Sequence, residues 1–211
     1  MRHPARRPVA LMAAVAVAAL VAVTGCGSDE PDQPAAPPAP DITRAPEDVR
    51  WQQWQGVSLP IGRVDGPTRS DAAASGFSHT PQGAALAAIQ HSVRMSLAPD
   101  SVWTSVAAQS LVSGPGKDEW VRSRVLVSIT GTDPAAAPSI TGYRISDWTP
   151  QRAGITVYTT YPDDSVLATD TVVTWTAEDW RLLLPDPATQ TVTQRDVPAV
   201  PGDIVRLEAT S

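Results

Sequence analysis

The 211-residue chain contains no asparagine, one cysteine, one lysine and three histidines. A single cysteine cannot form an internal disulfide. With 22 acidic against 16 basic residues, the formal net charge is −6, which excludes a strongly basic nucleic-acid-binding protein. The composition, which is 42% hydrophobic with 21 prolines and 13 glycines, also excludes collagen and coiled coil and leaves room for one ordinary domain.

The few histidines limit the chemistry that the chain can support. Beyond residue 25 only His79 and His91 remain, with no cysteine partner and no HExxH spacing, so no zinc ligand set is available. We place His79 in a loop and His91 on the solvent side of a helix. The chain has no GxSxG elbow. We therefore expect no catalytic residues, no metal and no cofactor.

One glycine-rich run has a superficial similarity to a phosphate-binding loop. It reads Gly114-Pro115-Gly116-Lys117-Asp118. Position 111, where the motif needs its first glycine, is leucine, and position 118, where it needs serine or threonine, is aspartate. We interpret the run as a turn between two helices.

The first 25 residues have the pattern of a bacterial signal peptide. Arg2, Arg6 and Arg7 precede an apolar run over residues 9–23, and these 15 residues are too short to span a bilayer comfortably. The run ends in Val23-Thr24-Gly25-Cys26, which resembles the lipobox of bacterial lipoproteins. That resemblance implies diacylglyceryl modification of Cys26, which would become the first residue after cleavage.

A lipid on Cys26 predicts where the protein is located. It would anchor the chain in the cell membrane on the extracytoplasmic face. Removal of residues 1–25 leaves 13 basic and 22 acidic residues, a net charge of −9. This charge argues against nucleic acid and against anionic head groups as partners, so the attachment should come from the acyl chains.

The segment after the cysteine differs in composition from the rest of the chain. Residues 26–48 are rich in proline, alanine and acidic side chains, so we expect a disordered tether. The folded domain should span residues 49–211. Its first part carries Trp51 and Trp54, which are costly to leave in water. They indicate an N-terminal arm that docks on the domain or, alternatively, a surface for a partner.

Apolar periodicity predicts helices between about residues 80 and 130. Thr80 and Pro81 have the N-cap and N1 identities that begin a helix. Apolar residues then follow at steps of three and four, namely Leu86, Ile89, Val93 and Leu97. Residues 99–101 open a second helix that ends before Gly114. Residues 118–129 fit a helix or a strand, and we predict a helix.

From about residue 139 to 208 the period changes to two. Four strands are expected over residues 140–148, 153–161, 166–176 and 180–184, with a last short strand near 204–207. Short turns between the four favour an antiparallel meander. Helices followed by strands predict the α+β class, with helices packed on a curved antiparallel sheet.

Motifs along residues 51–185 resemble an uncharacterised family of actinobacterial lipoproteins and secreted proteins, often encoded beside conjugative-element genes. The motifs are Trp54, Gly56, Leu59-Pro60, Gly66-Pro67, Gly76-Phe77, Thr80-Pro81 and Gly83-Ala84-Ala85. The element order is also similar to the nuclear-transport-factor-two-like (NTF2-like) or cystatin-like cone. Proteins with this fold include scaffold subunits, ligand binders and isomerase-like enzymes, so the resemblance implies one of these functions without indicating which.

Three functions are consistent with these features. The first is a non-catalytic interaction or assembly module of an envelope protein complex, accessory to conjugation or secretion. The second is a protein that binds a small apolar ligand in the mouth of the cone. The third is an isomerase-like enzyme, which requires Asp147 or Asp170 to be buried opposite Tyr143 or Tyr158. An open cavity under the sheet would favour the second or the third.

Overall fold

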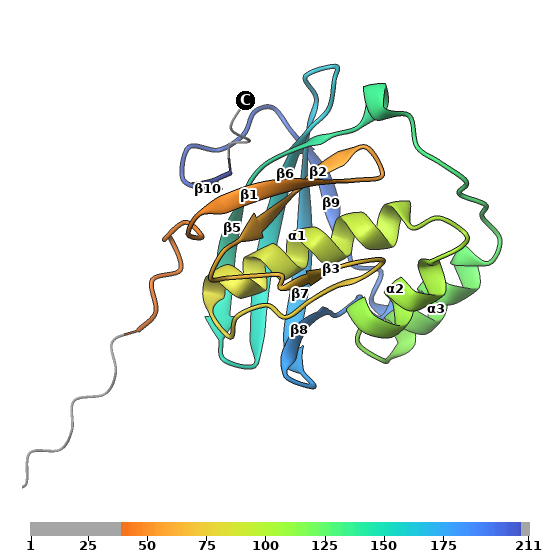
Figure 1. Ribbon diagram of the computed structural model, residues 1–211, viewed down its shortest axis with the longest axis horizontal. Coiled ribbons are helices and arrows are strands. Elements are labelled where there is room, and N and C mark those ends of the chain that lie inside the picture. The colour runs from red at the N-terminus through yellow and green to blue at the C-terminus, as the bar shows by residue number, and fades with distance from the viewer. Residues whose placement is uncertain (1–38, 208–211) are drawn as a thin grey trace, which may run out of the picture. The chain divides into compact units, whose positions relative to one another are not determined.

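The computed structural model describes residues 39–207 as a mixed α+β domain with a mostly antiparallel sheet (Figure 1). The expected signal peptide, the lipobox with Cys26 and the first part of the tether lie outside the described residues. The α+β class is confirmed.

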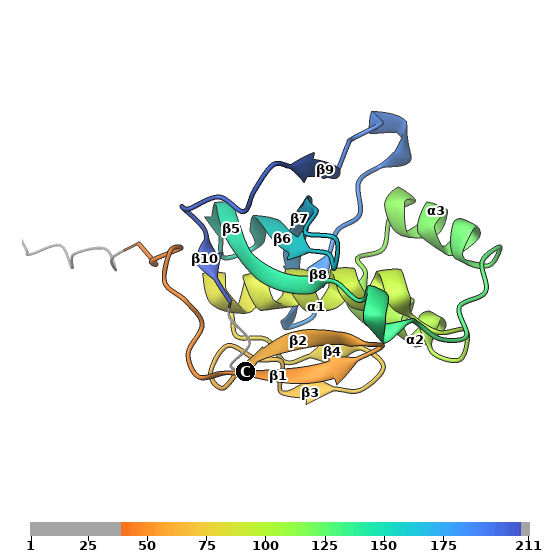
Figure 2. The same cartoon turned by 90° about the horizontal axis from the view of Figure 1, so that it is seen from above.

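The main sheet is built from the strands expected in the second half of the chain. They are β5 (Ser139–Thr149), β6 (Arg152–Thr160), β7 (Val166–Thr176), β8 (Asp179–Leu182) and β10 (Val205–Arg206), joined by β9 (Gln194–Val197). The order β10-β5-β6-β7-β8 is antiparallel throughout, and β9 also pairs with β7. The meander is confirmed, whereas β9 was not predicted. Two register shifts interrupt β5, which bends across the sheet (Figure 2).

Three helices precede this sheet, as expected. They are α1 (Pro81–Leu97), α2 (Trp103–Ser110) and α3 (Pro115–Arg124). The Thr80 hydroxyl accepts the Gly83 N–H at 3.0 Å, so the predicted cap of α1 is confirmed. The third helix begins and ends earlier than predicted. Its end leaves Val125, Leu126 and Val127 outside the helix and exposed.

Strands also precede the helices, where the sequence indicated only a docked arm and turns. β1 (Val49–Trp54) and β2 (Val57–Gly62) form a hairpin, and β3 (Arg69–Ser70) pairs with β4 (Ala74–Ser75). The β1–β2 turn places Gln55 at φ +50° and Gly56 at φ +81°, both left-handed, as tight two-residue hairpins require. The expected order of helices first and strands afterwards is therefore wrong for residues 49–75.

These hairpins make α1 the middle layer of the domain. Figure 2 shows the main sheet on one side of α1 and the hairpins on the other. All residues from Pro81 to His91 are buried as a result. His91, expected at the surface, is only 1% exposed, and that expectation is wrong because the imidazole packs against β8 of the main sheet and against Phe77.

The end of the expected tether also belongs to the domain. The Gln82 side-chain amide donates to the Asp41 and Arg44 carbonyl oxygens at 2.9 and 3.0 Å, and its Oε1 accepts from the Arg44 guanidinium at 3.1 Å. The Glu47 N–H donates to the buried Asp65 carboxylate at 3.3 Å. Residues 41–47 are thus fixed against the start of α1, and within the described chain the domain begins before residue 49.

Candidate functional site

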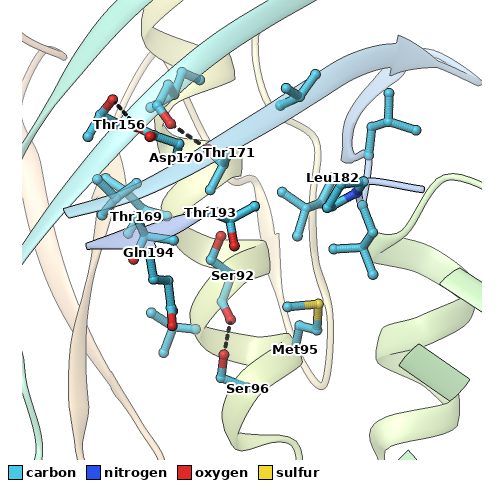
Figure 3. Close-up of a pocket in the computed structure, with 18 of the residues that line it drawn as sticks. Ser92, Met95, Ser96, Thr156, Thr169, Asp170, Thr171, Leu182, Thr193 and Gln194 are labelled. Atoms are coloured by element: carbon cyan, nitrogen blue, oxygen red, sulfur yellow. Dashed lines mark hydrogen bonds between the residues drawn. The ribbon is translucent and has the colours of Figure 1, made fainter. Parts of the chain in front are cut away.

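A cavity of about 1140 Å³ lies beside the second half of α1. Its walls come from α1, from β6 and β7, from the start of α3 and from the segment that follows β8 (Figure 3). Its volume exceeds the range of about 300–1000 Å³ that is typical of sites for drug-sized molecules. The cavity, partly open to solvent, is the candidate functional site.

The helix contributes its last two turns to this cavity. Ser92, Val93 and Met95 are only partly buried, and Ser96 is exposed, whereas the preceding residues of α1 are fully buried. Figure 3 shows Ser92, Met95 and Ser96 on this side of the helix. The hairpins and the sheet therefore enclose the first part of α1, while its C-terminal part faces open space.

The sheet contributes an alternating pattern of side chains. Ile155, Val157 and Thr159 in β6 lie opposite Thr171, Thr169 and Leu167 in β7, so these six share one face. Ile155 and Val157 are almost fully buried, and α1 packs on this strand. This face forms the mainly apolar inner wall of the cavity.

The opposite face of the same strands also lines the cavity. Thr156 is paired with Asp170, one residue out of phase with the inner wall, and the Thr156 hydroxyl donates to the Asp170 carboxylate at 2.6 Å. Both residues line the cavity, as do Asp147 and Arg152 at the β5–β6 turn. The cavity therefore extends past the edge of β7 from the inner to the outer face of the sheet, and its part on the outer face is polar.

The cavity can extend past this edge because the two strands that pair with it, β9 and β8, leave a gap between them. β9 pairs with residues 166–169 of β7 and β8 with residues 173–176. The Asp170 N–H donates to the Thr193 carbonyl oxygen at 2.7 Å, and the Leu183 N–H to the Val172 carbonyl oxygen at 2.8 Å. Between these two bonds the chain leaves the sheet over residues 184–192 and forms the side wall of the cavity.

Hydroxyl groups are the main polar groups of the inner wall. The Thr171 hydroxyl is already used, because it donates to the Ile155 carbonyl oxygen at 2.8 Å. The Ser92 hydroxyl has no hydrogen-bond partner in the described chain, although its oxygen is buried. An unpaired buried hydroxyl costs free energy. Ser92 therefore lines the cavity with the rest of its side chain, while its hydroxyl oxygen is not exposed to it.

The aspartates and tyrosines considered for isomerase-like chemistry do not come together. Asp147 is 53% exposed and forms an ion pair with Arg152 at 2.8 Å. Asp170 is 46% exposed and is paired with Arg195. Tyr143 and Tyr158 are buried but are not part of the cavity wall. Neither aspartate therefore has the buried position opposite a tyrosine that this chemistry requires.

Trp51 and Trp54 lie on β1 and are partly buried against the core. The Arg94 guanidinium lies 5.0 Å from the centre of the Trp54 ring. Arg94 is itself buried and donates to Ser70 Oγ at 2.7 Å and to Gln90 Oε1 at 3.0 Å. Burial lowers the pKa of Arg94 to about 10. Trp54 thus joins the hairpin to α1, in agreement with the docking interpretation.

His79 lies in a loop, as expected. It is exposed and stacks on the Trp175 ring with 4.0 Å between ring centres. Its Nε2 atom contacts the Pro150 carbonyl oxygen. Among residues 39–207 no group of three or more histidine, cysteine or acidic side chains is arranged to hold a metal ion. Within the same residues no helix combines the length and the hydropathy of a membrane span.

Sequence reasoning missed the cavity residues Ser92, Thr169, Thr171 and Lys117. A signal was present in β7, where Thr169 and Thr171 occupy positions on the face toward α1. Threonines on a core-facing strand indicate that the face is only partly packed. No comparable signal marked Lys117, because its approach to the cavity depends on how α3 packs beside the segment after β8.

The fold and the cavity define a small α+β protein with a mainly apolar cavity between a helix and a sheet. The chain belongs to the family described as "Domain of unknown function (DUF8175)", whose model matches residues 10–205. No curated protein and no solved structure matches the chain.

Proposed function

We propose that the chain is a non-catalytic, lipid-anchored envelope protein whose α+β domain binds a small apolar molecule. The observation that supports binding is the cavity of about 1140 Å³ beside the second half of α1. A domain that served only as a scaffold would gain stability by closing this space, since close packing is the rule in protein interiors. In this domain the space stays open, and the helix, the sheet and the segment after β8 form its walls.

The fold within the α+β class that agrees best with this function is the NTF2-like or cystatin-like cone. Three helices precede a long antiparallel meander, and β5 bends across it. Bulged and bent strands give such a sheet its concave face. We propose the cone on this basis, with the cavity at its open end.

The proposed anchor depends on the sequence around Cys26. The only cysteine of the chain follows Val23-Thr24-Gly25 at the end of an apolar run. A lipid there would hold the domain at the extracytoplasmic face of the cell membrane, where acyl chains and other apolar molecules are concentrated. We propose the membrane as its partner through this anchor.

Binding can be tested with the neutral fluorescent probe N-phenyl-1-naphthylamine. We would use the full chain with Cys26→Ala, so that no acyl chain attached at that position competes. The probe should become brighter with the parent chain. Val93→Trp and Ser96→Trp place a large ring at the cavity wall and should each reduce probe affinity about tenfold or more, as overfilled sites do.

The matched control is Val64→Trp, because Val64 is 54% exposed and lies outside the cavity wall. It should bind the probe like the parent. If the parent fails to bind the probe, or if both blocking variants are folded and bind it as well as Val64→Trp does, the proposed function is wrong. Circular dichroism of each variant establishes that it is folded.

An assembly role in an envelope complex, accessory to conjugation or secretion, is the second candidate. It is favoured by the run Val125-Leu126-Val127 after α3, whose residues are 61%, 86% and 54% exposed. A photo-crosslinking residue at position 126 in the native host should then join one envelope protein. Position 192, whose valine is 80% exposed, is the control and should not. Equal crosslinking at both positions would contradict the assembly role.

A further inference from the structure

The charged groups around the cavity differ in whether they already have partners. Asp170 accepts from Thr156 and Arg195, and Asp147 is paired with Arg152. Asp186 accepts the Ala188 N–H at 2.9 Å and caps the short 3₁₀ helix Pro187–Thr189. The carboxylates of the wall are therefore satisfied by the protein itself.

Lys117 is the exception among these groups. It is partly buried and lines the cavity, and its one hydrogen bond within residues 39–207 is donated to the Leu111 carbonyl oxygen at 3.4 Å. No carboxylate of residues 39–207 lies within 4.0 Å of it, whereas Arg152, the other cation of the wall, has Asp147. An ammonium has three donors, so Lys117 can still bind an acceptor.

The surroundings of Lys117 favour an anion. It lies in the first turn of α3, where Asp118 is the one acidic residue and no side chain caps the helix. The positive end of the helix dipole adds to the field of the ammonium there. Leu182, Leu183 and Leu184 line the cavity nearby, so the cation stands beside apolar surface. The chain also uses lysine nowhere else.

We infer that the ligand is an anionic amphiphile, a long-chain carboxylate, whose apolar chain occupies the inner wall and whose carboxylate binds the Lys117 ammonium. This inference deepens the proposed function and rests on it. The large volume suits a long chain, and Val93, Met95 and Leu183 offer it apolar contacts, because they line the cavity and are not fully buried.

Competition against N-phenyl-1-naphthylamine tests the inference, again in the full chain with Cys26→Ala. The competitors are hexadecanoate and its methyl ester, which differ in charge at one end. Hexadecanoate should displace the probe about tenfold better than the ester, since charge-assisted hydrogen bonds are the stronger ones. Lys117→Met should remove this preference, because it takes away the cation that distinguishes the acid from the ester. Lys117→Arg should retain it.

Arg152→Met is the matched control, because Arg152 also lines the cavity but already has a carboxylate partner. It should keep the preference for the acid. A preference that survives Lys117→Met, or that is lost with Arg152→Met instead, overturns the inference. Probe binding without any preference for the acid overturns the inference alone, whereas absent probe binding overturns the proposed function itself.

The single lysine also allows a direct measurement. Reductive methylation with ¹³C-formaldehyde labels one side chain, because Lys117 has no counterpart in the sequence. Hexadecanoate should shift the dimethyl-lysine signal in a ¹³C NMR spectrum, and the methyl ester should leave it in place. Equal shifts with both competitors would show that the ammonium does not recognise the carboxylate.

Discussion

The Nε2 atom of His91 lies 2.9 Å from the main-chain carbonyl oxygen of Trp180, and this hydrogen bond joins the middle of α1 to β8. The imidazole is almost fully buried and its Nδ1 atom has no partner in the described chain. The Phe77 ring meets it edge-on, with 5.4 Å between ring centres. Burial lowers the pKa of His91 to about 4, because desolvation disfavours the imidazolium.

His91 should make the stability of the domain depend on pH. Its pKa falls from 6.5 in the unfolded chain to about 4 in the folded protein. Above pH 6.5 both states are neutral there, and the stability is at its full value. Between pH 6.5 and 4 the unfolded chain takes up the proton first, so the free energy of unfolding should fall by about 3 kcal/mol.

Urea unfolding at pH 7 and pH 4.5 measures this dependence. His91→Gln keeps a donor toward Trp180 and does not titrate, so its stability should change less over this interval than that of the parent. His79→Gln, at an exposed loop position, should retain the parental dependence. The same pH dependence in the parent and in His91→Gln would contradict the assignment.

The cap of α1 gives a second prediction. Thr80→Ala removes the acceptor for the Gly83 N–H and a donor to the buried Asp65 carboxylate, which lies 3.2 Å away. Urea unfolding should show a loss of about 1–2 kcal/mol. Thr80→Ser keeps the hydroxyl and should lose little. Equal losses in the two variants would show that the methyl group, rather than the cap, is what matters.

A third prediction concerns Tyr143, which is fully buried and whose hydroxyl has no partner in the described chain. Burial raises its pKa, and the nearby Asp65 charge adds to this effect. Tyr143→Phe removes an unsatisfied polar group and should raise the free energy of unfolding by about 1 kcal/mol. Tyr161→Phe, at a partly exposed position, should change it by less than about 0.5 kcal/mol. A clear loss with Tyr143→Phe would reveal a bonded hydroxyl.

The lipid anchor is tested by growth of the host on radiolabelled palmitate. The parent chain should carry the label into the membrane fraction, and Cys26→Ala should be unlabelled, because it has no thiol to modify. Ser28→Ala, two residues away, is the control and should be labelled like the parent. Label in Cys26→Ala, or none in the parent, would contradict the anchor.

The sequence predicted those elements whose signals are local. Thr80 and Pro81 mark the start of α1, and turn residues between alternating segments mark β5 to β8. The β1–β2 hairpin was missed because its turn is Gln55-Gly56, whereas asparagine or aspartate before glycine is the usual signal. The burial of His91 was missed for another reason: it depends on how β8 and Phe77 pack against the helix face that had been assigned to solvent.

The cavity could not be predicted in the same way. It depends on how far the end of α1 stands from Val157 and Thr169, and on where the chain turns after Leu182. These are properties of packing between segments that are distant in sequence. The sequence could indicate an α+β domain with few catalytic groups. The space between α1 and the sheet follows only from the three-dimensional structure.

The interrupted edge of β7 has a consequence for protein engineering. The bonds from Leu183 to Val172 and from Asp170 to Thr193 fix both ends of the segment between them, so its length can change without altering the register of any strand. Val192 projects into solvent from that segment. A fluorophore attached there would report when a ligand occupies the adjoining cavity. Residues inserted beside it would change the affinity for that ligand. Neither change would alter the sheet.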